Sequence, residues 1–413
     1  MKSQSDKVYI TSIGSCTASG NSEDIFFNAK NKKSSLTVYN QITDDCPVKT
    51  VGKVKLKTDD IFAQKVRPFV SRNAELGAYA VSQCLNKIEL SRTIPDGLIF
   101  GSASQGIDKI MEVIDNLKDS PFNTLNHSNI SSITNAGVCR LLAERFSISG
   151  RVFAVEGASC SGMIAFIESF NAIKNKIASN MLAVSGEANL FKPAFLFYNK
   201  KVRVNKETYT FFGKVGESIF RRPSEAVVPY CIPEKSDRGV IAEGGAALFL
   251  ANENHIKEFD LPVFAEIENV FYYYNCTLSS NNDFLGLSNI LDKLKNEIFD
   301  SIYLPISGCW ATDYNLYTAC SHYFPNTHCF SVEPVIGHTG AVSGLINIIL
   351  GALSLKNSIL LPTLNFDGKN LDQGFKLKPS EVIIEKDIQR ILVISSGWGG
   401  YNGACVLKKY NGK

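Results

Sequence analysis

The sequence has 413 residues, of which 45% are hydrophobic and 20% are charged. A chain of this length and composition can bury large cores, so we expect a globular protein and not a fibrous or disordered one. The 43 basic and 40 acidic residues give a formal net charge of +3, which is too balanced for a nucleic-acid-binding protein.

Signals for secretion, membrane insertion and metal binding are missing from the sequence. No stretch reaches the roughly 18 uncharged apolar residues of a spanning helix, and the N-terminus lacks a signal-peptide core. The 11 cysteines form no CxxC pairs, and the five histidines form no HExxH motif or Cys/His cluster. We therefore expect a cytoplasmic protein with no membrane span, mostly reduced structural cysteines and no bound metal.

Six short runs rich in β-branched residues are followed by longer helical patterns. This alternation is typical of parallel strands joined by crossover helices, so the sequence predicts an α/β fold with buried strands. Catalytic groups tend to gather where the strands of such sheets end. The predicted strands are VYITSIG (8–14), GLIFGSA (97–103), RVFAVEG (151–157), MLAVSGEA (181–188), SIYLPISG (301–308) and RILVISSG (390–397).

Two of these strands flank a predicted helix over residues 161–177, where apolar residues recur at three- and four-residue spacing. A second helix lies within residues 337–355 and is apolar nearly all round, which is typical of a buried helix. Each half of the chain thus supplies a small-residue turn, one reactive side chain and a buried helix. The pattern predicts two similar α/β halves, 1–252 and 253–413, that share one core.

Cys160 lies in EGASCSGM, between a predicted strand and the first of these helices. A thiol at a helix N-terminus lies at the positive end of the helix dipole, beside unpaired N–H groups, and both lower its pKa. The small residues around it leave room for an acyl group to approach. Because free cysteine is also among the most buried residue types, the local pattern by itself favours a structural thiol.

His338 in IGHTGAVSG is the natural partner of Cys160. A neutral imidazole can donate a hydrogen bond to a developing oxyanion or accept a proton. A lone histidine, however, is more often a core residue with satisfied hydrogen bonds. The decisive signal is a set of four motifs in a fixed order along the chain.

The sequence resembles the beta-ketoacyl-acyl-carrier-protein synthase family, the condensing enzymes of the thiolase fold, from about residue 8 to 408. EGASCSGM is similar to the family's nucleophile elbow, and DRGVIAEGGAALFL (237–250) to its Asp-Arg-x-Gly and Gly-Glu-Gly-Ala block. GHTGAVSGLINIILGALSLKNSILLPTLNFD (337–367) is similar to its second-histidine helix, and SSGWGGYNGACVL (395–407) to its C-terminal glycine-rich turn. The resemblance implies a layered αβαβα thiolase-like architecture.

The resemblance also implies a reaction. Cys160 takes an acyl group from the phosphopantetheine arm of an acyl carrier protein, and the carbanion of a decarboxylated malonyl-type extender attacks the thioester. His338 stabilises the enolate or thioester oxygen, and the backbone N–H groups of Cys160 and Trp398 form the oxyanion hole, supported by Gly399 and Gly400. No bound cofactor is implied beyond the carrier's own arm. Trp398 replaces the family's usual gating phenylalanine, so we expect a differently shaped channel mouth.

Two family positions are altered. SGCWATD lacks the first histidine of relatives and has Ser307 or Cys309 in its place, although Asp313 fits the pattern. Glu333 stands where relatives have a lysine. Losing one oxyanion donor costs about 3 to 4 kcal/mol, or about 100- to 1000-fold in rate, and an ionised Glu333 would oppose enolate formation further. We therefore expect impaired condensation with acylation of Cys160 retained.

Other positions carry weaker expectations. Glu243 in AEGGA matches a structural glutamate of relatives and is expected to orient backbone. His322 is expected at the surface, and neither it nor His328 is expected to replace the missing histidine. The aromatic run over residues 191–215 fits an acyl channel, a dimer interface or ordinary core.

Three functions remain open: a condensing enzyme with an altered site, a non-elongating acyltransferase, and a chain-length-factor-like partner of an active ketosynthase. All three act with an acyl carrier protein in fatty-acid or polyketide assembly, and relatives imply a homodimer or a heterodimer. The basic segment KKVRVNK is a candidate docking site for an acidic carrier, although a solvated loop is its simpler interpretation. Its candidate residues are Lys200, Lys201, Arg203 and Lys206.

Overall fold

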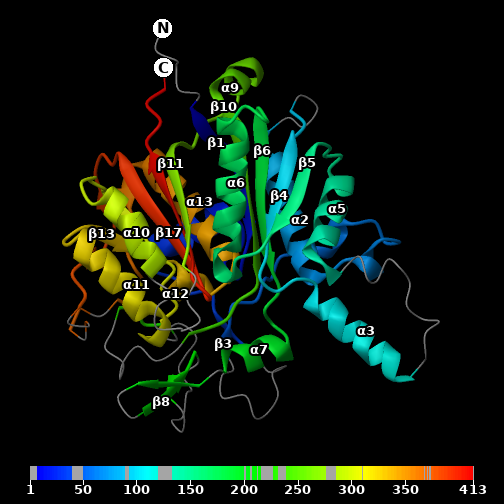
Figure 1. Ribbon diagram of the computed structural model, residues 1–413, viewed down its shortest axis with the longest axis horizontal. Helices are drawn as coiled ribbons and strands as arrows, with labels where there is room; N and C mark the ends of the chain where they lie inside the picture. The colour runs from blue at the N-terminus through cyan, green and yellow to red at the C-terminus, as the bar shows by residue number, and fades with distance from the viewer. Residues whose placement is uncertain are drawn as a thin grey trace.

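One large sheet organises the molecule, and the rings of Tyr9 and Tyr410, near the two ends of the described chain, lie 5.5 Å apart (Figure 1). It has 11 strands in the order β15-β13-β12-β17-β18-β11-β1-β10-β6-β4-β5. The computed structural model describes residues 7–39, 50–88, 93–119, 133–199, 201–204, 207–211, 213–214, 227–230, 239–275, 285–308, 310–366, 368–369, 371 and 374–412.

The first half of this sheet has five strands in the order β5-β4-β6-β10-β1. The strands β4, β5 and β6 are parallel, whereas β10 is antiparallel to both of its neighbours. Their bounds are β1 (Val8–Cys16), β4 (Gly97–Gly101), β5 (Arg151–Val155), β6 (Asn180–Glu187) and β10 (Gly244–Asn252).

The second half repeats this topology. Its order is β13-β12-β17-β18-β11, in which β12, β13 and β17 are parallel and β18 is antiparallel to both neighbours. β1 pairs with β11, which joins the halves into one sheet. The bounds are β11 (Ala265–Tyr274), β12 (Ser301–Tyr303), β13 (His328–Phe330), β15 (Lys378–Pro379), β17 (Arg390–Gly397) and β18 (Tyr401–Lys408).

Helices complete five layers. α2 and α5 cover the outer face of the first half, α10 flanks β11 and β18 of the second half with α11 packed against it, and α6 and α13 lie between the halves (Figure 1). Nearly every residue of α6 and α13 is buried, because both sequences are apolar on all sides. These helices are α2 (Arg72–Leu85), α5 (Asn135–Arg145), α6 (Ser161–Lys174), α10 (Leu285–Leu294), α11 (Trp310–Tyr323) and α13 (Val342–Asn357).

Shorter elements surround these layers. A 3-10 turn, η3 (Ala158–Cys160), connects β5 to α6. The remaining helices are α1 (Ser22–Lys30), α3 (Ile107–Asp119), α7 (Lys192–Tyr198), α9 (Glu253–Phe259), α12 (Glu333–Ile336), η1 (Asp59–Ile61) and η2 (Arg67–Phe69). The small sheets pair β2 (Thr37–Val38) with β3 (Thr50–Val51), β14 (Ile359–Leu360) with β16 (Ile384–Glu385), and β8 (Glu207–Thr210) with β7 (Val202–Val204) and β9 (Gly213–Lys214).

The predicted α/β fold with two similar halves and buried central helices is confirmed, and each of the six predicted strands forms. Two expectations were wrong. The sheet is mixed and not parallel throughout, because β10 and β18 return antiparallel beside β6 and β17. β5 is not buried: it lies at the sheet edge and pairs only with β4, which leaves its side chains half-exposed. The division of domains at residue 252 stays our proposal.

Seven cysteines belong to the described part of the chain, and each is a buried free thiol. Within the described ranges, no helix is both long and apolar enough to cross a membrane. Among the same residues, no group of three or more histidine, cysteine, aspartate or glutamate side chains could hold a metal ion.

Candidate functional site

Cys160 ends the sharp turn that leads from β5 into α6. Ala158 adopts a left-handed backbone with φ of 50°, which is costly for a residue with a Cβ. Ser161 fastens the turn, because its hydroxyl accepts from the Gly157 N–H (2.9 Å) and donates to the Ala158 carbonyl (2.6 Å). The strained turn therefore fixes Cys160 at the N-terminus of the buried helix.

The Cys160 thiol is fully buried. Its Sγ lies 3.6 Å from the Ser395 carbonyl oxygen, and a Cβ added at Gly403 would lie 3.3 Å from Sγ. Burial raises the pKa of the Cys160 thiol to about 12. The expectation that the helix N-terminus lowers this pKa was wrong, because desolvation by the surrounding core dominates.

The backbone around Cys160 bears on the predicted oxyanion hole. The Cys160 N–H donates to the Gly157 carbonyl (3.0 Å), so an incoming oxyanion has to compete with this bond. Gly397, which precedes Trp398, packs so closely that an added Cβ would lie 2.9 Å from the Cys160 nitrogen. The end of β17 is therefore directly beside the Cys160 backbone, and the oxyanion hole at Cys160 and Trp398 stays a prediction.

Gly399 and Gly400 form the turn that follows Trp398. Both have positive φ, 88° and 93°, which strongly favours glycine. A Cβ at Gly400 would lie 2.1 Å from the Asn275 carbonyl oxygen, and the Asn275 N–H donates to the Gly400 carbonyl (2.8 Å). The Trp398 ring is 36% exposed and lies 5.2 Å from the Phe197 ring, so the two aromatics form an exposed pair.

His338 occupies the corresponding turn between α12 and α13. Its N–H donates to the Val240 carbonyl (2.6 Å), and its own carbonyl accepts from the Ala242 N–H (2.9 Å). Its Nδ1 atom is buried and has no hydrogen-bond partner among the described residues. Burial lowers the pKa of His338 to about 4, so the imidazole is neutral at pH 7.

The N-termini of α6 and α13 meet in the core, and this meeting brings Cys160 and His338 to one region. A Cβ added at Gly162 would lie 2.2 Å from the Ala341 carbonyl oxygen. Gly162 follows Cys160 by two residues, and Ala341 follows His338 by three. Only glycine permits this approach of the two helices.

The turn after β12, where relatives carry the first histidine, is held by Asp313. The Asp313 carboxylate accepts from the Ser307 N–H (3.1 Å), the Ser307 hydroxyl (2.9 Å) and the Gly308 N–H (2.7 Å). Cys309 lies outside the described residues. Asp313 is buried, and these bonds hold the turn at Ser307 and Gly308.

Neither nearby histidine replaces the missing one. His322 is exposed on α11, as predicted. His328 begins β13, where its Nδ1 lies 2.7 Å from the Ser301 hydroxyl oxygen. Ser301 and His328 are register partners at the first residues of their parallel strands, the opposite end from the site turns.

Glu333 is completely buried beside the turn after β12. Its Oε2 accepts from the Ser331 hydroxyl (2.8 Å), and its Oε1 has no hydrogen-bond partner among the described residues. Burial is the main cause that raises the pKa of Glu333 to about 8. The negative charge of Asp313 raises it further. The uncharged acid is therefore favoured at pH 7, so the ionised carboxylate that would oppose enolate formation is not the favoured state of Glu333.

Glu333→Gln is expected to flatten the pH dependence of stability. A neutral buried acid stabilises the fold fully below its ordinary pKa of 4.5, and this contribution is lost as the pH rises towards about 8. Glutamine copies the shape of the neutral acid but cannot ionise. The difference in melting temperature between variant and wild type should therefore be larger at pH 8.5 than at pH 5, in favour of the variant, by about 1 °C for each kcal/mol in a chain of 413 residues.

Thermal unfolding followed by circular dichroism at both pH values measures this difference. The exposed Glu385→Gln is the matched control and should track wild type at each pH. A Glu333→Gln variant that tracks wild type equally well would contradict the burial of a neutral acid at this position.

Glu187 was missed from the sequence. It ends β6, where its Oε1 accepts from the Ser102 hydroxyl (2.7 Å) and from the Ala103 N–H. Burial raises the pKa of Glu187 to about 7, and its Oε2 would lie 3.4 Å from a Cβ at Gly340, two residues after His338. Its position at the carboxyl end of a predicted strand was the signal that could have found it.

Two aromatic side chains from the run over residues 191–215 pack on His338. The ring centroids of Phe211 and Tyr198 lie 5.6 Å and 6.0 Å from that of His338. The two rings also contact each other, at 4.8 Å. Part of the aromatic run therefore packs around His338. From the sequence, the run could have been an acyl channel, a dimer interface or ordinary core.

No protein-family model matches the sequence. A protein of Schizosaccharomyces pombe named for a mitochondrial 3-oxoacyl-[acyl-carrier-protein] synthase is 24% identical over 341 residues, which cover 78% of this chain and 76% of that protein. 3-Oxoacyl-[acyl-carrier-protein] synthase 2 of Rhizobium meliloti is 33% identical over 82 residues, which are 20% of this chain and 19% of the relative. The chain is a relative of the beta-ketoacyl-acyl-carrier-protein synthases.

Solved structures show the same fold for this ketosynthase relative. The ishigamide ketosynthase/chain length factor superposes with a TM-score of 0.82 at 15% identity, covering 98% of this chain and 100% of that one. A type II polyketide ketosynthase in complex with its acyl-carrier protein superposes with a TM-score of 0.80 at 17% identity and the same coverage. Similarity along nearly the whole chain supports the thiolase-like architecture.

The candidate docking segment of this ketosynthase relative is mostly outside the described residues. Lys200 and Lys206 are not described, and nothing is known of the Arg203 side chain, whereas Lys201 is exposed. Carrier docking at this segment therefore stays a prediction.

Proposed function

We propose that this chain is a beta-ketoacyl-acyl-carrier-protein synthase-like acyltransferase, which accepts acyl chains from the phosphopantetheine arm of an acyl carrier protein onto Cys160. The observation that carries the proposal is the meeting of two buried helices at Gly162 and Ala341, with a cysteine leading into one and a histidine into the other. Relatives named for 3-oxoacyl-carrier-protein synthesis support the substrate class.

In the proposed acylation, the Cys160 sulfur attacks the carrier thioester carbonyl and the carbon–sulfur bond to phosphopantetheine breaks. The thiol proton leaves with the departing phosphopantetheine sulfur, which becomes the free thiol of the carrier. The step requires the Cys160 side chain to turn away from the Ser395 carbonyl, which holds it in this structure. A pKa of about 12 makes the resting thiol unreactive, so activation has to accompany substrate binding.

The proposed condensation step is weaker than acylation. A malonyl-type carbanion needs donors at its oxygen, and the turn after β12 offers Ser307 and Gly308, whose N–H groups already serve Asp313. His338 is then the single imidazole assigned to this task. We propose slow decarboxylation, about 100- to 1000-fold below a site with two imidazole donors.

Intact-mass spectrometry with acyl carrier protein, followed by malonyl carrier protein and measurement of carbon dioxide, tests the function. Acylation with slow carbon dioxide release and a ketoacyl product supports the proposal. Acylation without any carbon dioxide release supports non-elongating acyl transfer. Copurification with an active ketosynthase and no acylation supports a chain-length-factor-like role and rejects the proposed enzyme.

A second subunit is part of the proposal, because solved neighbours include a ketosynthase/chain length factor. The edge strand β5 offers a place for it, since it pairs with β4 on one side only. Its residues Val152, Phe153, Ala154 and Val155 are each half-exposed, which suits continuation of the sheet by a second copy or a related chain.

A further inference from the structure

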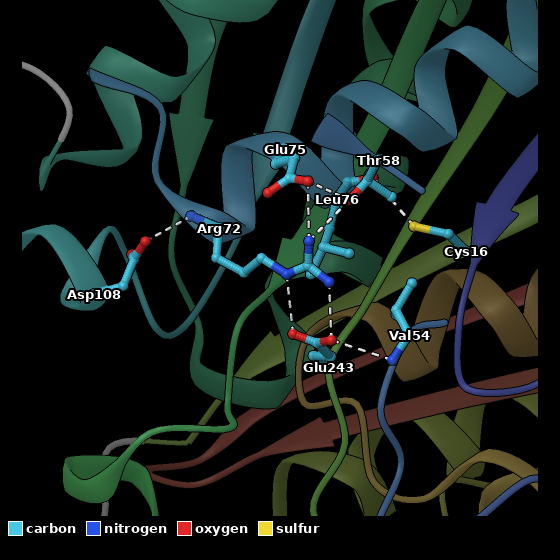
Figure 2. A network of polar contacts seen from close by, with 8 residues as sticks. All are labelled: Cys16, Val54, Thr58, Arg72, Glu75, Leu76, Asp108 and Glu243. Carbon is cyan, nitrogen blue, oxygen red and sulfur yellow. Dashed lines mark hydrogen bonds and ion pairs between the residues drawn. The ribbon is translucent and has the colours of Figure 1, made fainter. Parts of the chain in front are cut away.

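Arg72, at the start of α2, is held between two carboxylates (Figure 2). Its Nε and Nη2 donate to Oε2 (3.1 Å) and Oε1 (2.9 Å) of Glu243, and its Nη1 lies 3.0 Å from Glu75 Oε1. Nη1 also donates to the Thr58 hydroxyl (2.8 Å), and the Arg72 backbone N–H donates to Asp108 (2.8 Å). A two-pronged pair of this kind fixes both position and orientation of the carboxylate.

The residues before Glu243 hold the backbone of His338. Val240 accepts from the His338 N–H and Ala242 donates to the His338 carbonyl, at 2.6 Å and 2.9 Å. Ile241 and Glu243 bond on the other side to Gly52, whose N–H donates to the Ile241 carbonyl (3.1 Å) and whose carbonyl accepts from the Glu243 N–H (3.0 Å). The segment 240–243 thus lies between the segment at Gly52 and the segment at His338.

The close packing of these segments leaves little freedom. A Cβ at Gly52 would lie 2.1 Å from the Ile336 carbonyl oxygen and 2.5 Å from the Ala242 Cβ. Glu243 Oε1 also accepts from the Val54 N–H (3.1 Å), so one carboxylate ties two of the segments to the guanidinium of Arg72. A shift of Glu243 is therefore transmitted through 240–242 to the turn at His338.

The His338 ring depends on this backbone. Its Nδ1 makes no hydrogen bond among the described residues, so that atom supplies no anchor for the ring. The aromatic neighbours Phe211 and Tyr198 restrict the ring by packing but do not bond it. Small errors in the position of a catalytic group are costly, because about 1 Å of misplacement can lower a rate about 100-fold.

From these contacts we infer that Arg72 is a positioning residue for His338. It acts through the Glu243 carboxylate and the segment 240–242, and it links the outer helix α2 to the turn before α13. The expected effect of Arg72 on the reaction rate rests on the proposed function, whereas its expected effect on the position of His338 does not. Glu243 was expected to orient backbone, and Arg72 is the group that orients Glu243.

Histidine resonances test the structural consequence without any substrate. In protein labelled with 13C and 15N at histidine, His338→Asn identifies the His338 signal. Arg72→Met should shift or broaden this signal and leave those of His322 and His328 in place, because His338 alone among the described histidines is bonded to segment 240–242. Arg72→Lys, which keeps the charge but not the two-pronged geometry, should give a smaller shift of the same signal.

Arg390→Met is the matched control. Arg390 also bridges two carboxylates, Glu268 (2.7 Å) and Glu297 (2.8 Å), but it begins β17, the opposite end of that strand from the Trp398 turn. It should leave the His338 signal unchanged. An unchanged His338 signal in both Arg72 variants, or an equal shift in Arg390→Met, overturns the inference.

The kinetic consequence is measured as carbon dioxide release. Arg72→Met should slow release about tenfold with Cys160 acylation within about twofold of wild type, and it should add nothing in a His338→Asn background. Equal slowing in both backgrounds would mean that Arg72 acts independently of His338 and would overturn the inference. If the wild-type protein is not acylated, the proposed function fails, and the histidine resonances still decide the role of Arg72.

Discussion

Cys160→Ala is expected to abolish acylation by acyl carrier protein. The Cys160 sulfur is the proposed attacking atom, and alanine leaves no nucleophile in the turn between β5 and α6. The rate of adduct formation should fall at least about 1000-fold, since removing a nucleophile eliminates the covalent step. Intact-mass spectrometry after incubation with acyl carrier protein measures the adduct directly.

The matched control is Cys84→Ala. Cys84 is another fully buried thiol, and burial raises its pKa to about 12 as well, but it lies on α2 in the outer layer. This variant should acylate at the wild-type rate when folded. Acylation that persists in Cys160→Ala, or that is lost equally in Cys84→Ala, would remove Cys160 from the proposed reaction.

His338→Asn is expected to have the second largest effect, on decarboxylation. With one imidazole assigned to the enolate oxygen, its removal should lower carbon dioxide release from malonyl carrier protein by about 100- to 1000-fold. Acylation of Cys160 should be affected less, because we propose that backbone N–H groups form the oxyanion hole of that step. Burial holds the pKa of His338 near 4, so the wild-type rate should not change through His338 ionisation between pH 6 and 8.

His322→Asn is the control for this measurement, since His322 is exposed on α11. It should release carbon dioxide at the wild-type rate. A His338→Asn variant as active as His322→Asn would show that the enolate is stabilised elsewhere, and would favour the turn at Ser307 and Gly308.

Local patterns predicted much of the fold. Apolar, β-branched runs that end at small residues predicted six of the strands, each of which forms, and the apolar run within 337–355 predicted the buried helix α13. The antiparallel course of β10 and β18 was not predictable, because direction depends on the partner strand and not on the strand's own residues. The exposure of β5 was not predictable for a similar reason, because an edge strand and a central strand can have the same sequence pattern.

The candidate site divides in a similar way. Sequence motifs singled out Cys160 and His338 as candidates, and the small residues beside Cys160 predicted room for an acyl group. The charge states of Cys160 and Glu333 could not be predicted from the sequence, because their pKa values depend on how far the folded core excludes water from them. Arg72 was beyond reach as well, since it is separated from Glu243 by 171 residues and carries no local motif.

The sequence by itself determined the kinds of element and the two candidate reactive side chains, because these depend on residue type and on short-range spacing. The tertiary structure decided which groups meet, as at Gly162 and Ala341, and which are charged, as at Glu333. The reason is physical: contact and desolvation arise from residues distant in the chain, and they exist only once the two halves enclose α6 and α13.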